Sequence, residues 1–169
     1  MTVHMEEQAG TNRKVLAVKT KSIPDELRVR PQWVVWKAVG AKPEKIPYSP
    51  KTGRKASSTD LMSWSTYEEA YSAYERGGCA GVGFVFSSAD PFTGIDLDGC
   101  VDPATGEVAV WAMEIVRYFD SYTELSASGT GIHIIVKGEM PNRRKDEVEV
   151  YSSKRFFTVT GHVLEVDGD

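Results

Sequence analysis

Cysteine, histidine and long apolar runs are all scarce in this sequence. Its 169 residues include two cysteines, Cys79 and Cys100, and three histidines. Two cysteines are too few for a disulfide framework and are not spaced as metal ligands, so redox chemistry is not indicated. No segment approaches the roughly 18 to 20 consecutive apolar residues of a membrane span, and the N-terminus lacks the basic-then-apolar order of a signal peptide. We therefore expect a cytoplasmic protein that has no membrane partner.

The rest of the composition is that of one globular domain with an uneven distribution of charge. Apolar residues make up 41% of the chain and charged residues 26%, so a core can form. Residues 1–55 carry a net charge of +7 and residues 56–169 carry −11, within a total of −4. A basic region beside an acidic one suits a protein that binds a polyanion and divalent cations on different surfaces. A solvated basic face would give the same pattern.

The hydrophobic periodicity predicts an α+β fold with a largely antiparallel sheet. Residues 1–22 are polar and aperiodic and are expected to form a flexible arm, which leaves 23–169 as the folded core. Proline and glycine in 40–60 predict a long loop. The segments 81–86 and 93–98 predict a hairpin. Further strands are expected at 32–39, 123–127, 132–137, 147–151, 156–160 and 163–166, and helices at 65–76 and 108–119.

An acidic pair lies on one of these strands. Asp96 and Asp98 are separated by one residue, so both carboxylates project from the same face. Hard divalent ions such as Mg²⁺ prefer one or two carboxylates together with phosphate oxygens. A single pair of this kind also occurs on ordinary solvated strands. A calcium loop is excluded, because Cys100 and Val101 stand where that loop needs an oxygen ligand and a glycine.

A turn rich in glycine and hydroxyl groups precedes the strand at 132–137. Ser128, Thr130 and Gly131 offer hydroxyls and backbone N–H groups to an anion, and His133 adds a ring N–H donor. Such a turn suits a triphosphate, although a plain hairpin turn has the same composition. A zinc site at His133 is disfavoured because no cysteine or second histidine lies at ligand spacing.

A third group combines carboxylates with a guanidinium. Glu147 and Glu149 share one face of a predicted strand, and Arg155 begins the strand that is expected to pair with it. Arg155 is suited to a bidentate phosphate contact. The alternative is a surface ion pair of little energetic value.

These three groups, in this order, resemble the motifs of the archaeo-eukaryotic primase superfamily, in particular the primase-polymerase domains of phages and plasmids. Asp96-Leu97-Asp98 resembles the first motif, Gly131-Ile132-His133 the second and Val148-Glu149 the third. The resemblance covers 23–166. It departs from the family at Gly131, where serine is frequent, and at Glu149, where many members have aspartate.

The resemblance implies a two-lobed core, with an N-terminal α/β unit and a C-terminal unit like an RNA-recognition motif. It also implies template-directed nucleotidyl transfer on single-stranded DNA from nucleoside triphosphates, in the replication of mobile elements. Because charge develops on the attacking and leaving oxygens, two Mg²⁺ or Mn²⁺ ions are expected to stabilise both. Asp96, Asp98 and Glu149 are the expected metal ligands and, with His133, the expected catalytic residues.

The remaining site residues are assigned to phosphate and template. His133, Ser128, Thr130, Gly131, Arg155 and Lys45 are expected to bind the nucleotide, and Trp33, Trp36, Lys51 and Arg54 the template. Two alternatives stay open: a catalytically inactive module of this fold that binds single strands or nucleotides, and a metal-dependent nuclease. The chain is expected to be part of a larger replication protein, with a helicase or helical region as a partner.

Overall fold

The computed structural model describes residues 15–166 of the chain. Residues 1–14 of the expected arm lie outside the described residues. From residue 15 onward the chain already packs on the domain, because the Leu16 amide donates to the Ala127 carbonyl and the Lys19 amide to the Thr160 carbonyl. The folded region therefore begins earlier than the expected boundary at 23.

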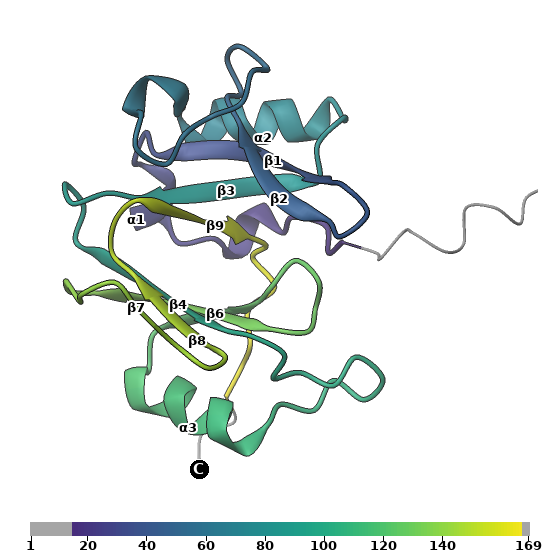
Figure 1. The fold of residues 1–169 in the computed structure, drawn as a ribbon, viewed down its shortest axis with the longest axis vertical. Helices are drawn as coiled ribbons and strands as arrows, with labels where there is room; N and C mark the ends of the chain where they lie inside the picture. The colour runs from purple at the N-terminus through teal and green to yellow at the C-terminus, as the bar shows by residue number, and fades with distance from the viewer. Residues whose placement is uncertain (1–14, 167–169) are drawn as a thin grey trace, which may run out of the picture.

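Two antiparallel sheets build the domain, which confirms the predicted α+β class. The four-stranded sheet has the order β2-β1-β3-β9 and the five-stranded sheet the order β5-β6-β4-β8-β7. In Figure 1 the first sheet lies above the second, with α2 over the upper sheet and α3 under the lower one. The strands are β1 (Trp33–Val39), β2 (Glu44–Tyr48), β3 (Gly81–Phe86), β4 (Phe92–Leu97), β5 (Tyr122–Leu125), β6 (Ile132–Lys137), β7 (Arg143–Lys145), β8 (Val148–Tyr151) and β9 (Arg155–Val159). The α-helices are α1 (Asp25–Arg28), α2 (Tyr67–Glu75) and α3 (Val110–Phe119), and short 3₁₀ turns cover Thr20–Ser22 and Leu61–Ser63.

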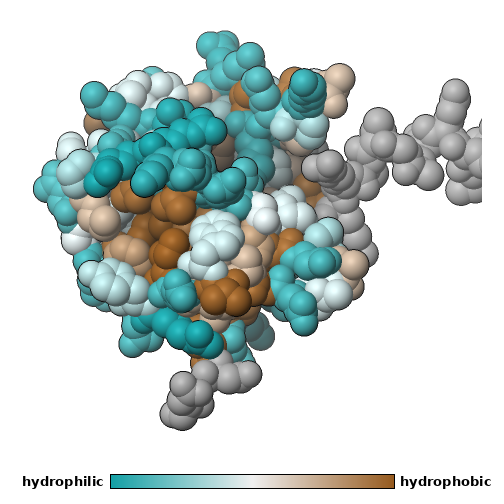
Figure 2. All heavy atoms as spheres, turned by 60° about the horizontal axis from the view of Figure 1, so that its bottom comes forward, coloured by the Kyte–Doolittle hydropathy of each residue, from teal (hydrophilic) through white to brown (hydrophobic). Residues whose placement is uncertain are grey.

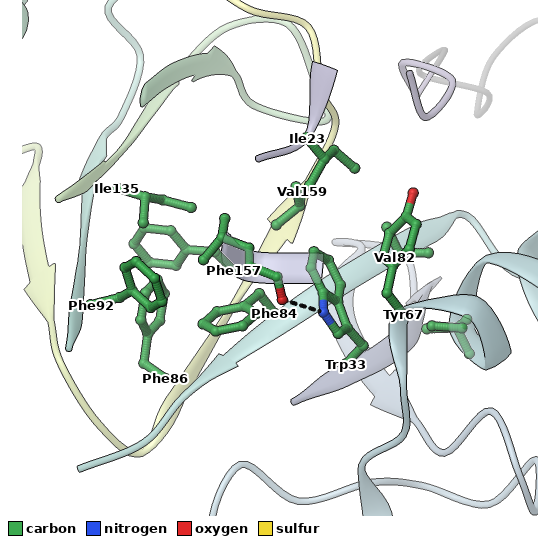
Figure 3. Packing of buried hydrophobic residues seen from close by; sticks show 13 residues of the cluster. Ile23, Trp33, Tyr67, Val82, Phe84, Phe86, Phe92, Ile135, Phe157 and Val159 are labelled. Atoms are coloured by element: carbon green, nitrogen blue, oxygen red, sulfur yellow. Dashed lines mark hydrogen bonds between the residues drawn. The ribbon is translucent and has the colours of Figure 1, made fainter. Parts of the chain in front are cut away.

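The main core is aromatic and joins the two sheets. Phe84 and Phe86 of β3 and Phe157 of β9 pack against Phe92 and Ile135 of the five-stranded sheet (Figure 3). The Phe86 and Phe157 rings meet edge to face with their centroids 5.0 Å apart. Such pairs add about 0.5 to 1.5 kcal/mol each to the stabilisation from burial. The core therefore holds the two sheets together.

The two longer helices begin and end at recognisable signals. Thr66 caps α2, and its hydroxyl accepts a hydrogen bond from the Glu69 amide, so this helix begins within the segment predicted at 65–76. Helix α3 ends at Asp120, whose backbone is left-handed at φ 43°. Ala112 and Val116 are its buried positions, and they pack against the five-stranded sheet.

The expected hairpin between 81–86 and 93–98 is wrong. Strands β3 and β4 belong to different sheets, and the chain crosses between them at Asp90. This carboxylate accepts hydrogen bonds from the Ser87 and Phe92 amides and from the side chain of Gln32, the residue before β1. These bonds fix a bend that carries the chain out of the first sheet, which local sequence pattern does not specify.

The expected pairing of the strand at 147–151 with the strand that Arg155 begins is also wrong. Strand β8 lies in the five-stranded sheet, whereas β9 pairs with β3 in the four-stranded sheet. The chain changes sheet through Lys154, which has a positive φ of 59°. The last strand thus completes the sheet built by the first strands, so the expected division into an N-terminal and a C-terminal lobe is not followed along the sequence.

Three smaller expectations also need correction. The loop expected over 40–60 contains β2, an edge strand of the four-stranded sheet, which is a position where proline is tolerated. Strand β7 was not predicted. The strand expected at 163–166 is reduced to one bridge between Val163 and Glu124.

Within the described part of the chain, no helix has the length and apolar character needed to cross a bilayer. Helix α3 exposes Val110, Trp111 and Tyr118. Figure 2 brings this end of the molecule forward and shows apolar surface gathered among hydrophilic side chains.

Candidate active site

A straight row of side chains crosses the five-stranded sheet. His133 of β6 lies directly opposite Asp96 of β4, and Asp96 lies directly opposite Glu149 of β8. The row extends to Glu124 of β5 at one end and to Arg144 of β7 at the other. Directly opposed residues of antiparallel strands project from the same face. We call these five residues the cross-sheet row.

The opposite face of the same strands is apolar. Ile95 and Leu97 alternate with Asp96 on β4, and Ile132 and Ile134 flank His133 on β6. All four are buried and belong to the cluster that packs on α3. Because successive side chains of a strand point to opposite faces, each strand is anchored by its apolar face and carries the row on the other face.

The centre of the row borders a pocket of about 210 Å³ that both sheets line. The five-stranded sheet contributes the carboxylates and the imidazole, whereas β2 and β9 contribute a lysine and an arginine. Positive and negative groups from different sheets thus face one space. The lining residues are Lys45, Asp96, His133, Glu149, Tyr151, Arg155, Phe156, Phe157 and Thr158.

Asp96 is the central residue of the row, and charged neighbours on both sides affect its pKa. Its Oδ1 lies 3.6 Å from Nε2 of His133. Burial raises the pKa of Asp96, and the nearby Asp98 and Glu149 charges raise it further, while His133 and Lys45 oppose the shift. A bound cation would relieve the repulsion among these carboxylates.

Glu149 is held by two neighbours. Its Oε1 lies 3.1 Å from Nε of Arg144, and its Oε2 accepts a hydrogen bond of 3.1 Å from the Tyr151 hydroxyl. The Arg144 side chain is 74% exposed, so this ion pair is screened by solvent. Burial and the Glu149 charge raise the pKa of Tyr151, which keeps the phenol as a donor.

His133 is fixed on three sides. Its Nδ1 lies 3.3 Å from Oε1 of Glu124, and its Nε2 faces Asp96. The Phe157 ring stacks on the imidazole with a centroid separation of 4.7 Å. The side chain is 5% exposed, so the imidazole has a defined position at the edge of the pocket.

The basic residues of the pocket lie over aromatic rings. The Lys45 ammonium is 5.9 Å from the centroid of the Trp36 ring, and the Arg155 guanidinium is 5.0 Å from that of Tyr151. Thr158 also lines the pocket, and its buried hydroxyl has no hydrogen-bond partner among residues 15–166. A buried hydroxyl is normally satisfied, so a polar ligand atom is a suitable partner.

The donor chemistry fits a hard divalent cation, although three protein ligands are not assembled. Among residues 15–166, no three His, Cys, Asp or Glu side chains form a group that could hold a metal ion. Asp98 is exposed just past the end of β4 and does not line the pocket. Asp96 and Glu149 face the same space, and two carboxylates completed by phosphate oxygens and water are a normal Mg²⁺ environment.

The turn before β6 does not reach the pocket lining. The Gly131 amide donates to the Ser126 hydroxyl, so this amide is already engaged. The hydroxyls of Ser128 and Thr130 lie 2.8 Å apart and bond each other. Nucleotide binding by Ser128, Thr130 and Gly131 stays a prediction.

The two tryptophans that were expected to bind the template are buried in this structure. Trp33 is fully buried in the core, where its indole N–H donates to the Leu27 carbonyl. Trp36 is 2% exposed. Neither ring offers a free face to a base. Lys51 and Arg54 are exposed on the loop after β2, and template binding by them stays a prediction.

Glu124, Tyr151 and Thr158 were missed as functional residues. Each lies within a strand, and for Tyr151 and Thr158 the sequence does not distinguish the residue from an ordinary core or surface residue. The alternation within Tyr122–Leu125 does place Glu124 and Tyr122 on one face, and that is the one signal available.

Comparison with known proteins supplies a relative for this domain. No family model matches the chain. The chain is 41% identical over 142 residues to the DNA primase-polymerase of Nitratiruptor phage NrS-1, and the matched region covers 79% of this chain. The chain spans about a fifth of the length of that relative, 20%. The identity confirms the resemblance drawn from the three motifs: this chain is a domain of the primase-polymerase type.

Proposed function

We propose that this domain carries out template-directed nucleotidyl transfer. A 3′ hydroxyl oxygen bonds to the α-phosphorus of a nucleoside triphosphate, the bond to the bridging oxygen breaks, pyrophosphate leaves and the hydroxyl proton is lost to solvent. The observation that carries the proposal is the cross-sheet row, in which Asp96 lies between His133 and Glu149 and borders a pocket that also holds Lys45 and Arg155.

The charges of the pocket suit a polyphosphate that arrives with a cation. Carboxylates alone would repel a triphosphate. Lysine and arginine alone could bind the phosphates, so the carboxylates beside them point to a cation that binds together with the triphosphate. A pocket of about 210 Å³ is smaller than the roughly 300 to 1,000 Å³ that enclose a drug-sized ligand. We infer that it takes the phosphate end of the nucleotide and leaves the base at the surface.

Six of the nine residues that line the pocket have a role in this proposal. Asp96 and Glu149 would hold Mg²⁺ or Mn²⁺, and Asp98 would add its negative charge from the strand end outside the pocket. When bound, two such ions supply charge stabilisation to the attacking and leaving oxygens. Arg155 and Lys45 neutralise the phosphates, His133 in its imidazolium form donates from Nε2 to a phosphate oxygen, and Thr158 supplies a hydroxyl.

The substrates are proposed from the relative's name and from this chemistry. They are a single-stranded DNA template and nucleoside triphosphates, in the replication of a phage or a similar mobile element. A helicase or helical region acting with the domain is part of the same proposal.

The direct test is incubation of the chain with a primed single-stranded template, nucleotides and Mn²⁺. Asp96→Asn should abolish extension of labelled primer, because the substitution keeps the shape of the side chain and removes its charge. Asp120→Asn is the matched control, since Asp120 lies exposed at the end of α3 and asparagine also tolerates the left-handed conformation there.

Three outcomes separate the alternatives. Longer products that Asp96→Asn loses and Asp120→Asn keeps support the polymerase. Shortening of the template would support a nuclease, and a mobility shift without new product would support a binding module. Either of the last two results would overturn the proposal.

A further inference from the structure

The most deeply buried charge of the cross-sheet row is a carboxylate that the proposed reaction does not use. Glu124 is 0% exposed, on β5 opposite His133. Burying a carboxylate is costly unless several donors satisfy it. A residue of this kind needs a specific explanation.

Part of the explanation is structural. The Thr160 amide lies 3.1 Å from both Glu124 oxygens, and the Gly161 amide donates to Oε2 at 2.9 Å. The Tyr122 hydroxyl donates to Oε2 at 2.7 Å. Glu124 therefore ties the segment after β9 to the five-stranded sheet. Gly161 is required there, since its φ is +70° and a Cβ would lie 2.1 Å from the Lys19 carbonyl oxygen.

These donors do not by themselves require a carboxylate, because a glutamine oxygen also accepts from amides and phenols. The contact that does depend on a carboxylate is the one to His133. Oε1 lies 3.3 Å from Nδ1, and an ionised carboxylate can only accept. The Thr160 and Gly161 amides and the Tyr122 hydroxyl all donate to Glu124, an environment that suits an ionised carboxylate, and toward such a carboxylate Nδ1 is the donor.

We propose that Glu124 is a positioning residue that fixes the His133 ring with Nδ1 protonated and presents Nε2 to the pocket. Glu124 holds the imidazole at one edge, Phe157 holds it at one face, and Nε2 is left 3.6 Å from Asp96. A carboxylate that orients a functional histidine through its second nitrogen is a general device of protein sites. With Nδ1 protonated, Nε2 donates to a phosphate oxygen only in the imidazolium form, in which both ring nitrogens carry a proton. That use of Nε2 rests on the proposed function, whereas the Nδ1 proton does not.

The test is a long-range ¹H–¹⁵N correlation spectrum of the imidazole nitrogens in the ¹⁵N-labelled chain. Replacing His4 and His162 by glutamine in turn identifies their signals, and the third set belongs to His133. A protonated, pyrrole-like Nδ1 is expected. A bare, pyridine-like Nδ1 would overturn the proposal, and this measurement needs no variant of Glu124.

Two variants separate positioning from mere folding. In Glu124→Gln the amide no longer compels protonation of Nδ1, so the nitrogen pattern of His133 should change. Tyr122→Phe removes another bond to Glu124 but leaves its charge, so the pattern should stay as in the native chain. An unchanged pattern in a folded Glu124→Gln would count against the assignment.

Activity supplies a separate readout. Loss of such a supporting carboxylate typically lowers activity or affinity by about 10- to 100-fold, and Glu124→Gln should weaken nucleotide incorporation to that extent. If Asp96→Asn retains full activity, the proposed function fails while the ring-state assignment stands. If the Nδ1 proton is absent while Asp96→Asn is inactive, the positioning role alone fails.

Discussion

The two faces of the five-stranded sheet show how differently alternate residues of the same strands are used. On the face toward α3, Ile95, Leu97, Ile132 and Ile134 are buried among apolar neighbours. On the other face, Asp96 and His133 stand one residue away and border a polar pocket. Substitutions on the first face should act on stability and those on the second on chemistry. The following predictions test this separation.

The largest effect is expected on the charged face. Glu149→Gln removes one of the two carboxylates that face the pocket, and if the ion it helps to hold contributes about 3 kcal/mol to the transition state, primer extension should fall by about 100-fold. Glu114→Gln makes the same change on the exposed side of α3 and should leave extension unchanged. An equal loss of extension in both variants, or no loss in either, would contradict the proposed role of the charged face.

The next effect is expected on the apolar face. Ile134→Ala removes a fully buried side chain next to His133 and should lower the free energy of unfolding by about 2 to 5 kcal/mol. Urea denaturation measures this change. Extension per folded molecule, assayed at low temperature, should stay close to that of the native chain. A stable but inactive Ile134→Ala would contradict the separation of the two faces.

A smaller effect is expected at the phosphate contact. Arg155→Lys keeps the charge but loses the planar pair of donors. The loss of one charge-assisted hydrogen bond of about 1.5 kcal/mol should raise the KM for nucleotide by about tenfold and leave kcat nearly unchanged. A drop in kcat at constant KM would place Arg155 in the transition state instead.

The smallest effect is expected at the open end of the row. Arg144→Gln breaks a solvent-exposed ion pair with Glu149 and should change the free energy of unfolding by less than about 1 kcal/mol. Because Arg144 competes with a cation for Glu149, Mn²⁺ should bind slightly more tightly to this variant. Titration calorimetry with Mn²⁺ checks the direction, and weaker binding would mean that Arg144 supports the site.

Much of the fold could be predicted because its signals are local. The amphipathic pattern of α3, the cap of α2 and the alternation of β4 and β6 all follow from side-chain periodicity and hydrogen-bonding chemistry. The assignment of strands to sheets could not be predicted. Asp90 and Lys154 turn the chain from one sheet to the other through contacts that arise only in the folded molecule.

The candidate site divides in the same way. Asp96, His133 and Glu149 stand out in the sequence because their types and order resemble known motifs, and the structure places them side by side. Glu124 does not stand out, because a glutamate in a short strand normally faces solvent. Trp33 and Trp36 were assigned to the template because aromatic residues near lysines occur both in cores and on nucleic-acid surfaces. Only their burial, which the sequence does not give, distinguishes the two.

Paramagnetic broadening by Mn²⁺ tests most directly whether the cross-sheet row is where a metal-bound nucleotide docks. Proton signals of the His133 ring should broaden when Mn²⁺ and a nucleoside triphosphate are added together, and those of His162 much less. Asp96→Asn should suppress the broadening at His133. Broadening that spares His133, or that persists in Asp96→Asn, would contradict the account.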